Sequence, residues 1–332
     1  MSVRILLVAL LSFCLLAGWL WLDFRRFASQ PLPIGATGVT VTLAPGSSLR
    51  RLARDLVERD LLENPYYLRF LARLRGQANR LQAGEYHVPR GTTPTALLEQ
   101  LTSGRVIQYP LTLIEGWTFS QVLAALAADT RLRQTLDGME PHEVMAQLGQ
   151  PEQHPEGRFY PDTYHFPRGT SDLQFLRRAY QTMQQVLAEE WSGRQPELPL
   201  ATPDEALTLA SIIEKETGLA GERREIAGVF VRRLRRGMKL QTDPTVIYGL
   251  GPKFDGNLRR RDLERATPYN TYVHPGLPPT PIAMPGRDSI HAALHPADGQ
   301  SLYFVARGDG SHQFSRTLAE HNRAVRKYQL KQ

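Results

Sequence analysis

An uncharged stretch of 18 residues near the N-terminus, "ILLVALLSFCLLAGWLWL" at residues 5–22, most restricts how this chain can fold. A bilayer-spanning helix needs about 20 mostly apolar residues, and Trp19 and Trp21 stand where an interfacial aromatic belt occurs. A cleaved signal peptide has a shorter apolar core, of about 7–15 residues, that ends in a small-x-small site. Here bulky residues, "WLWLDFRR", follow the core. The sequence therefore predicts one uncleaved membrane anchor over residues 1–22.

The orientation of this anchor is not decided by the flanking charges. Arg4 precedes the span, whereas Arg25 and Arg26 follow it, and the positive-inside rule then argues against export of the C-terminal part. Cys14, the only cysteine, lies inside the span, so no intramolecular disulfide can form. Cysteine usage therefore gives no information on the compartment.

Composition predicts a folded protein of two or so domains, because 42% of the 332 residues are hydrophobic and 22% are charged. The net charge is +7, but most basic residues alternate with acidic ones, as in "RRLARDLVERD" and "GERREIAGVFVRRLRRG". We therefore expect no nucleic-acid partner. An anionic membrane or wall polymer nearby would be tolerated.

Residues 23–38 are predicted to be a linker, because they contain Pro31, Pro33 and two glycines and few large apolar groups. From residue 39 onward, four segments each contain an apolar strand, a glycine, a hydroxyl residue two positions later and an amphipathic helix. Their glycines are Gly46, Gly91, Gly116 and Gly169, and their hydroxyl residues are Ser48, Thr93, Thr118 and Ser171. The glycine permits a tight turn and the hydroxyl can cap the helix. The pattern indicates either an internal repeat or a common structural unit used four times.

From about residue 203 the pattern changes to longer helices, expected at about 203–217 and 222–236. An irregular passage rich in Pro and Gly, "ATPYNTYVHPGLPPTPIAMPG", follows and is predicted to be a cap or a binding wall. A hairpin that turns at Asp309-Gly310 and a closing helix end the chain. The whole is predicted to belong to the α+β class.

The segment "LASIIEKETG" contains the strongest candidate for chemistry. At about 100° per residue, Ala210, Ser211 and Glu214 lie on one stripe of the helix and Glu216 lies on the opposite side. The two glutamates therefore cannot work as a pair. A charged group beside small residues would suit the floor of a cleft, although a surface glutamate next to Lys215 is the alternative.

Metal and cofactor chemistry have little support in the sequence. His291 and His295 have helical i, i+4 spacing, but no glutamate follows His291 and no third ligand is evident, so we expect no metal site. The chain has no P-loop, dinucleotide fingerprint or nucleophile elbow, and we expect no cofactor.

A carboxyl group in apolar surroundings can instead protonate a glycosidic oxygen, because burial raises the pKa of a carboxyl. The small-residue stripe around Glu214 offers such a setting. Glycosidases usually add a second carboxylate, although enzymes assisted by the substrate's own N-acetyl group need only one. Asp243 is the best second candidate, but the helix N-cap interpretation of Asp243 is favoured because Pro244 follows it.

Four segments in order, "TLASIIEKETG", "VFVRRLRRGMKLQTDPTVIYGLG", "YNTYVHPGLPPTPIAMPG" and "LYFVARGDGSHQFSRTLAEHN", closely resemble the endolytic murein transglycosylases of the YceG-like family. The similarity extends from about residue 39 to the C-terminus. It implies a single-pass protein of the bacterial inner membrane, with a cytoplasmic N-terminus and the catalytic part in the periplasm. It also implies a LysM-like module at residues 39–105 and a lytic transglycosylase domain at residues 106–332.

The resemblance implies that Glu214 is the catalytic acid and then the base. Glu214 would protonate the bond between N-acetylmuramic acid and N-acetylglucosamine and then deprotonate the muramoyl C6 hydroxyl, so that a 1,6-anhydro end forms. Similarity to the wider lysozyme-like transglycosylases, in which a glutamine and a Tyr-Asn pair line the groove, indicates substrate contacts at Gln241, Tyr269 and Asn270. The full set of expected substrate contacts is Gln241, Asp243, Tyr248, Tyr269, Asn270 and Tyr272. Asp162 and Tyr164 are further candidates, with a core position as the alternative.

The expected partners are peptidoglycan glycan strands, the membrane and peptidoglycan synthases. Anchoring near newly made strands would let an internal cut end strand elongation. Two other functions remain open from the sequence: a hydrolytic muramidase that admits water to the same site, and a scaffold that only binds peptidoglycan.

Overall fold

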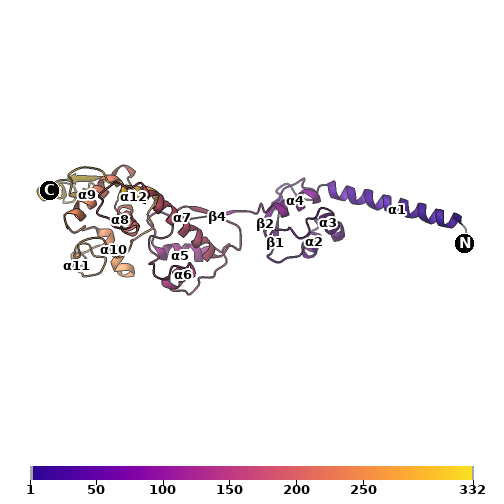
Figure 1. Ribbon diagram of the computed structural model, residues 1–332, viewed down its shortest axis with the longest axis horizontal. Coiled ribbons are helices and arrows are strands. Elements are labelled where there is room, and N and C mark those ends of the chain that lie inside the picture. Colours follow the sequence, from indigo (N-terminus) through magenta and orange to yellow (C-terminus); the bar gives the residue numbers. More distant parts are fainter. Residues whose placement is uncertain (1–2, 331–332) are drawn as a thin grey trace. The chain divides into compact units, whose positions relative to one another are not determined.

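The computed structural model of the chain describes residues 3–330 and divides into two compact units (Figure 1). Unit 1 contains the residues up to 109 together with residues 165–169, and unit 2 contains residues 110–164 together with those from 170 onward. Helices are combined with three two-stranded sheets among the described residues. The predicted α+β class is therefore confirmed.

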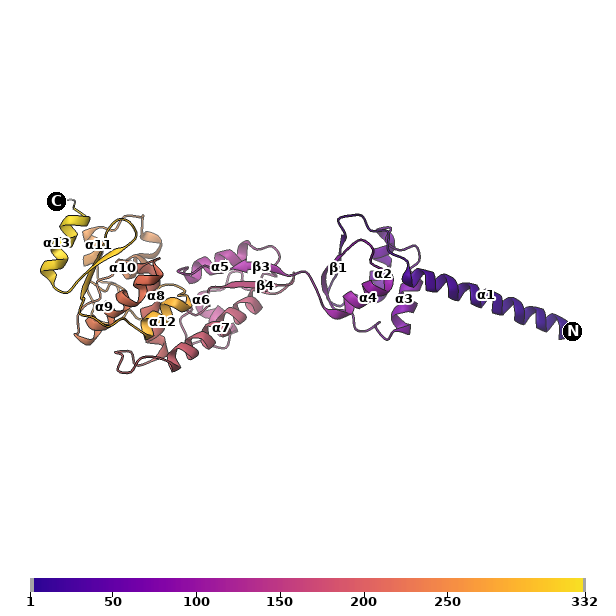
Figure 2. The same ribbon diagram turned by 90° about the horizontal axis from the view of Figure 1, so that it is seen from above.

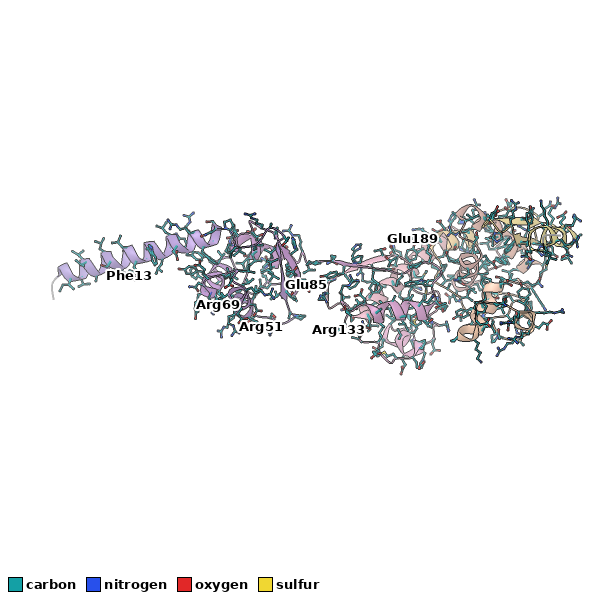
Figure 3. The ribbon with its side chains drawn as sticks, turned by 180° about the vertical axis from the view of Figure 1, so that it is seen from behind. Phe13, Arg51, Arg69, Glu85, Arg133 and Glu189 are labelled. Carbon is teal, nitrogen blue, oxygen red and sulfur yellow. The ribbon has the colours of Figure 1, made fainter. Side chains whose placement is uncertain are left out.

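Unit 1 begins with helix α1 (Val3–Ser29), whose apolar residues 5–22 are all exposed. Phe13, for example, is 68% exposed and projects from the helix (Figure 3). The segment Ile5–Ser29 is long and apolar enough to cross a membrane. The single apolar helix that the sequence predicts near the N-terminus is therefore present.

The structure differs from the sequence prediction over residues 23–38, which are not a free linker. Helix α1 continues to Ser29, and the ring of Phe24 packs edge-on against Phe70 with a centroid distance of 5.0 Å. Beyond the helix, Leu32 and Ile34 are each only 7% exposed, and the N–H of Leu32 donates to the carbonyl of Thr92 at 2.8 Å. The prolines keep this segment extended, so alternate side chains can enter the core of unit 1.

The core of unit 1 lies between a two-stranded sheet and three helices. Strand β1 (Val39–Leu43) pairs antiparallel with β2 (Gly84–Val88), and Val39 lies opposite Val88. Helices α2 (Leu49–Glu58) and α3 (Pro65–Leu74) connect the two strands, and α4 (Pro94–Ser103) follows. Alternate strand residues face inward, where they meet buried leucines of the three helices. The fully or almost fully buried leucines are Leu52, Leu56, Leu68, Leu97, Leu98 and Leu101.

The local structure predicted for the four repeated segments is present in all of them. Each glycine has a positive φ angle, of 75°, 85°, 77° and 87° at Gly46, Gly91, Gly116 and Gly169. Each hydroxyl residue is a helix N-cap whose side chain accepts a backbone N–H: Ser48, Thr93, Thr118 and Ser171. These contacts are local, so they explain the shared pattern without a common ancestor.

The first part of unit 2 contains helices α5 (Phe119–Ala128), α6 (Pro141–Gln147) and α7 (Asp172–Ser192). Strands β3 (Tyr109–Thr112) and β4 (Thr163–Phe166) form a two-stranded sheet, of which Tyr109 and residues 165–166 belong to unit 1. The rings of Phe119, the first residue of α5, and Phe159 stack with a centroid distance of 5.2 Å, and both are buried.

The second part of unit 2 is built around helix α8 (Pro203–Glu216), which has α9 (Arg223–Arg235), α10 (Asp243–Leu250) and α12 (Arg287–Leu294) around it (Figure 2). The 3-10 turns η1 (Ala220–Glu222) and η2 (Gly251–Lys253) and helix α11 (Arg260–Glu264) connect these elements. The helices predicted at 203–217 and 222–236 are thus confirmed as α8 and α9. Every side chain of α8 from Ala206 to Ile213 is buried.

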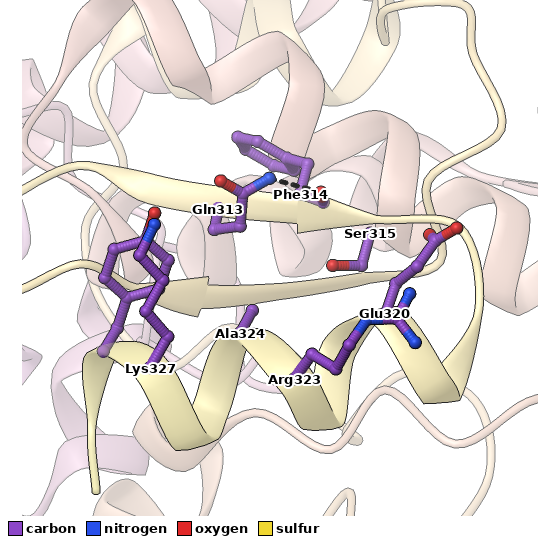
Figure 4. A pocket seen from close by; sticks show the side chains of 8 residues that line it. Gln313, Phe314, Ser315, Glu320, Arg323, Ala324 and Lys327 are labelled. Atoms are coloured by element: carbon purple, nitrogen blue, oxygen red, sulfur yellow. Dashed lines mark hydrogen bonds between the residues drawn. The ribbon is translucent and has the colours of Figure 1, made fainter. Parts of the chain in front are cut away.

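The C-terminal hairpin and closing helix are also confirmed. Strand β5 (Tyr303–Ala306) pairs antiparallel with β6 (His312–Ser315), and α13 (Leu318–Tyr328) packs beside both strands. A hollow of about 300 Å³ lies between β6 and α13, and Figure 4 shows the side chains that line it. Polar and charged side chains such as Gln313, Arg323 and Lys327 line this hollow.

Candidate active site

The sequence predicts that the small-residue stripe of α8 forms the floor of a cleft. In the structure a loop covers this stripe, so it is not an open floor. Ala210 and Ser211 are fully buried. The hydroxyl of Ser211 accepts the N–H of Ile282 at 3.0 Å and donates to the carbonyl of Thr208 at 2.7 Å. Small side chains are needed here because the backbone of residues 281–286 lies directly against the helix.

Glu214 lies one turn beyond Ser211, where the same loop ends. The N–H of Gly286 donates to Glu214 Oε2 at 2.9 Å, and the Arg223 guanidinium is 3.9 Å from Oε1. The Glu214 side chain is only 7% exposed. Arg223 also donates to Asp288 at 3.2 Å. A glutamate that the sequence placed beside small residues is therefore fixed by a backbone N–H and an adjacent cation.

The loop that positions Gly286 is anchored on both sides. Arg287, the first residue of α12, donates to Glu189 at 2.8 Å and to Glu190 at 2.7 Å, both on α7. Backbone hydrogen bonds join Met284 to the turn that precedes α5: Gly116 N–H donates to Met284 at 2.8 Å, and Met284 N–H donates to Trp117 at 2.7 Å. The loop therefore connects α7, α8 and the start of α5 at the position of Glu214.

A second carboxylate, Glu115, lies at this site and was missed by the sequence analysis. A Cβ atom added to Gly286 would lie 1.9 Å from Glu115 Oε1, so the Glu115 carboxylate occupies the space beside the residue that binds Glu214. Partial burial raises the pKa of Glu115, the nearby Glu214 raises it further, and Arg223 lowers it. The repeated segments contain a signal that could have identified Glu115. The residue before the glycine is acidic only in the segment of Gly116, whereas it is Pro45, Arg90 or Arg168 in the other three.

Glu216 lies on the other side of α8, as predicted. The Thr242 hydroxyl donates to its carboxylate, and burial raises the pKa of Glu216 to about 7. The buried guanidinium of Arg233 opposes this shift and is itself bound to the carbonyl of Leu240 at 2.6 Å. The two glutamates of α8 therefore have separate sets of contacts.

Gln241, Asp243 and Tyr272 come together next to Glu216. Gln241 is exposed and has a φ angle of 50°, an uncommon conformation that non-glycine residues adopt mostly at turns and functional sites. Thr242, not Asp243, is the N-cap of α10, so the N-cap prediction for Asp243 is wrong. Asp243 occupies the first helical position and accepts the Tyr272 hydroxyl at 2.6 Å.

Tyr248 and Tyr269 form a pair that is partly buried in the core of unit 2. Their rings meet edge to face with a centroid distance of 4.8 Å. The Tyr248 hydroxyl donates to Glu156 at 3.0 Å, and the Tyr269 hydroxyl lies 2.8 Å from that of Thr280. Glu156 is 3% exposed, and burial raises its pKa to about 7. Both tyrosines contribute packing and place a polar atom at the edge of the core.

Asn270, predicted to contact substrate, is fully buried and has a structural role instead. Its amide nitrogen donates to the carbonyls of Leu263 at 3.0 Å and Arg265 at 2.8 Å, at the end of α11. Its amide oxygen accepts the N–H of Tyr272 at 2.8 Å. The amide group is therefore used to terminate a helix and to fix the following turn, and none of it faces solvent.

The remaining sequence candidates lie elsewhere. Tyr164 is 6% exposed and packs against Phe175, which places it in the core, whereas Asp162 is exposed. The rings of His291 and His295 stack at 4.2 Å, and His291 contacts Glu190 at 2.8 Å. Within residues 3–330 no group of three His, Cys, Asp or Glu side chains is arranged to bind a metal ion.

A hollow of about 630 Å³ lies beside the N-terminal half of α8. Asp204 and Thr208 of α8, Arg158 and the loop at residues 276–281 line it. Neither this hollow nor the one in Figure 4 includes Glu214.

Comparison with known proteins identifies relatives of the chain. The YceG-like family matches residues 41–327. An endolytic murein transglycosylase of Bacillus subtilis is 34% identical over 309 residues, which cover 88% of this chain and 85% of that protein. A protein of the same name from Streptococcus pneumoniae is 26% identical over 361 residues, which cover 97% of this chain and 65% of that protein.

The fold is also similar to a solved structure. A crystal structure of a YceG-like protein from Listeria monocytogenes has a TM-score of 0.54 at 30% identity and covers 87% of this chain and 99% of that one. The family match spans most of the chain and includes all the residues around Glu214. This chain therefore belongs to the YceG-like family.

Proposed function

We propose that this protein is a peptidoglycan lytic transglycosylase that cuts glycan strands internally and that Glu214 is its catalytic acid and base. The observation that carries the assignment is the position of Glu214. Its carboxylate is 7% exposed, bound by the N–H of Gly286 and adjacent to Arg223, at the meeting point of three chain segments. The relatives named endolytic murein transglycosylases support the substrate class.

The proposed reaction uses Glu214 twice. In the first step, the protonated carboxyl donates its proton to the oxygen that joins N-acetylmuramic acid to N-acetylglucosamine, and the bond from muramoyl C1 to this oxygen breaks. Positive charge develops at C1. In the second step, the Glu214 carboxylate removes the proton of the muramoyl C6 hydroxyl while that oxygen bonds to C1. The products are a 1,6-anhydro end and a free N-acetylglucosamine hydroxyl, and Glu214 is protonated again.

Two features of the site suit this double use. The bond from Gly286 keeps one carboxylate oxygen oriented, so the other can exchange the proton. Gln241, Asp243 and Tyr272, together with the tyrosine pair Tyr248 and Tyr269, offer amide, hydroxyl and ring contacts for sugars. We assign substrate contacts to these five residues, with Asn270 acting only through the backbone that it positions.

The decisive experiment is product analysis with the full chain in detergent. Uncross-linked glycan strands are digested and the fragments are examined by mass spectrometry. Internal fragments with 1,6-anhydromuramoyl ends are expected, and Glu214→Gln should abolish them, whereas Glu152→Gln, at an exposed glutamate, should not. Reducing ends would identify a hydrolytic muramidase instead. Binding without any cleavage would identify a scaffold.

The same proposal includes placement in the bacterial inner membrane. Helix α1 would cross the bilayer once, with the N-terminus in the cytoplasm and the rest in the periplasm. Because the end of α1 packs into unit 1, the module is attached to the membrane by a helix and not by a flexible segment. Protease protection of spheroplasts checks this topology: external protease should digest both units and leave α1.

Unit 1 has the order β1-α2-α3-β2. We propose that it is a LysM-like module that binds glycan and presents it to the catalytic unit. Peptidoglycan synthases are proposed partners, because their products emerge at the membrane. A glycan pull-down tests binding. It uses the full chain with substitutions at exposed residues of β1, for instance Thr42→Glu. Pull-down equal to that of the unchanged chain would mean that unit 1 only supports the fold.

A further inference from the structure

Glu115 lies close to Glu214, and Gly286 connects the two carboxylates. The N–H of Gly286 donates to Glu214 Oε2 at 2.9 Å, and its missing Cβ would lie 1.9 Å from Glu115 Oε1. With standard backbone geometry, these two carboxylate oxygens are at most about 7 Å apart. Paired carboxylates of glycosidases are separated by about 5–9.5 Å. This upper limit is within the range in which two carboxylates can act on one glycosidic bond.

The backbone at Glu115 is fixed, whereas its side chain is exposed. The Lys215 ammonium donates to the carbonyl of Gly116 at 3.2 Å, and Gly116 N–H donates to Met284 at 2.8 Å. These contacts attach the turn to the helix that carries Glu214 and to the loop that carries Gly286. The Glu115 carboxylate can therefore reach a bound ligand without losing its position relative to Glu214.

We propose that Glu115 is a second catalytic carboxylate of this site, facing the muramoyl C1 and stabilising the positive charge that develops there. The inference rests on the proposed function of Glu214. Glu115 forms no covalent bond and transfers no proton. It attracts the positive charge that develops at C1 when the bond to the leaving oxygen breaks.

Kinetics of Glu115→Gln, compared with Glu152→Gln as the matched exposed control, test the proposal. We expect kcat to fall about 10-fold with KM changed less than about twofold, since solvent screens part of the charge interaction. Glu115→Asp should recover part of the rate. A residue that only supports the turn would change stability, not kcat at saturating substrate.

The pH profile gives a readout that a structural role does not affect. The charged and titratable groups around Glu115 are Glu214, Arg223, Asp288, Lys215 and Tyr160. Glu115 must be ionised to stabilise the charge at C1, and partial burial and the nearby Glu214 raise the pKa of Glu115. Protonation of Glu115 should therefore contribute to the acidic limb of kcat/KM, and this contribution should be absent in Glu115→Gln. Unchanged kcat and an unchanged acidic limb would overturn the proposal.

A titration without substrate separates this inference from the proposed function. The carboxyl carbon of Glu115 is followed by NMR against pH in the unchanged chain and in Glu214→Gln. Because the Glu214 charge raises the pKa of Glu115, its titration midpoint should fall in the variant. An identical midpoint would show that the two carboxylates do not interact, even if Glu214 proves to be catalytic.

A second, independent inference concerns an apolar face of unit 1. Tyr66, Phe70 and Leu74 lie on one side of α3, at helical spacing, and are 67%, 50% and 59% exposed. Phe70 meets Phe24 at 5.0 Å, and Phe24 meets Trp21 at 5.7 Å. This face, which we name the α3 face, is therefore continuous with the apolar surface of α1.

We infer that the α3 face lies in the interfacial region of the membrane that α1 spans, an inference that rests on the proposed anchoring. Large exposed apolar groups next to a membrane helix, with Arg69 and Arg73 beside them, match the composition of interfacial helices that bind acidic lipids. Arg69 stacks over Tyr66 at 5.6 Å and lies on the surface of α3 (Figure 3). Insertion of this face would orient unit 1 on the bilayer.

Spin labels on the full chain in vesicles of phosphatidylglycerol and phosphatidylethanolamine test the α3 face. Labels are attached at Phe70→Cys or Leu74→Cys with Cys14→Ser, and at Thr42→Cys on β1, which Figures 1 and 2 place away from α1 within unit 1. Labels on α3 should collide mainly with lipid-soluble oxygen, and the label at residue 42 mainly with a water-soluble nickel complex. The native Cys14 reports insertion of α1 itself.

Equal nickel accessibility at residues 70, 74 and 42, with a label at Cys14 protected, would overturn the membrane assignment for α3. That result would mean that the α3 face is exposed to water. A nickel-accessible Cys14 would instead contradict the proposed anchor.

Discussion

The two sides of the C-terminal turn of α8 carry carboxylates in opposite settings. On one side, Glu216 is bound by Thr242, next to the buried Arg233, and burial raises its pKa to about 7. On the other side, Glu214 contacts Gly286 and Arg223, with the exposed Glu115 close by. The difference shows that a raised pKa does not by itself identify a catalytic acid, because the group must also reach substrate.

The first side is a buried structural cluster, and the second resembles a reactive site. Glu216 and Arg233 each bond to partners in their own chain, and these hydrogen bonds support the packing of α8 on α9 and α10. Around Glu214, three loops converge and a glycine leaves space for a second carboxylate. Each of the following predictions tests whether the two sides differ in this way.

The largest expected effect distinguishes the two glutamates directly. Glu214→Gln should lower strand cleavage by about 100- to 10,000-fold while the free energy of unfolding changes by less than about 1 kcal/mol, because the amide oxygen can still accept Gly286 N–H. Glu216→Gln should retain most of the cleavage. Release of anhydromuropeptides and thermal unfolding measure the two quantities. Comparable loss of cleavage in both variants, with both folded, would remove the distinction.

The pH dependence of stability should come from the Glu216 side. The folded protein binds the Glu216 proton more tightly than the unfolded chain does, because burial raises the pKa from 4.5 to about 7. The contribution of Glu216 to the free energy of unfolding is therefore most favourable below pH 4.5. It falls by an amount on the order of 2–3 kcal/mol as the pH rises to about 7. Denaturant unfolding between pH 4.5 and 7.5 should show a smaller decline in Glu216→Gln than in the unchanged chain. An equal decline in both proteins would mean that Glu216 does not cause the loss of stability with rising pH.

Gly286→Ala should have a smaller effect, and this effect should be on the Glu214 side of α8. The backbone of Gly286, with φ of −76°, accepts an alanine, but the new Cβ would lie 1.9 Å from Glu115 Oε1. We expect cleavage to fall about 10-fold and stability to fall by about 1–2 kcal/mol, because Glu115 or the loop must move. The double variant with Glu115→Ala should regain stability without regaining cleavage. If the double variant is no more stable than Gly286→Ala alone, the contact is not the cause.

Local features of this fold were predictable from sequence. The helix caps at Ser48, Thr93, Thr118 and Ser171, the helices α8 and α9 and the C-terminal hairpin follow from hydrogen bonds and side-chain periodicity within about ten residues. The opposite placement of Glu214 and Glu216 follows from helix geometry alone. Such features need no knowledge of distant segments.

Features that depend on distant segments were missed. Glu115 meets Glu214 only because backbone bonds at Gly116 and Trp117 attach their turn to Met284. Residues 23–38 have a linker-like composition, yet Leu32 and Ile34 find partners in the core of unit 1. In both cases the partner lies too far along the chain for a local pattern to indicate it. Asn270 differs: its Tyr-Asn motif predicts a substrate contact, but its amide bonds to the nearby carbonyls of Leu263 and Arg265 at the end of α11.

The smallest expected effect asks whether substrate also touches the Glu216 side. Tyr272→Phe removes the 2.6 Å hydrogen bond to Asp243, and the matched Tyr269→Phe removes the 2.8 Å contact with Thr280. Each change should cost about 0.5–1.5 kcal/mol of stability at most. If the exposed Asp243 and the half-buried Tyr272 bind sugar, Tyr272→Phe should raise KM about two- to tenfold. Tyr269→Phe should leave KM unchanged, because it keeps the ring that we assign to sugar contact and removes only a hydroxyl that already bonds to Thr280. Steady-state kinetics on glycan strands of defined length measure both. An unchanged KM in Tyr272→Phe would confine the substrate to the Glu214 side of the helix, where Glu115, Gly286 and Arg223 would then be its protein contacts at the cleaved bond.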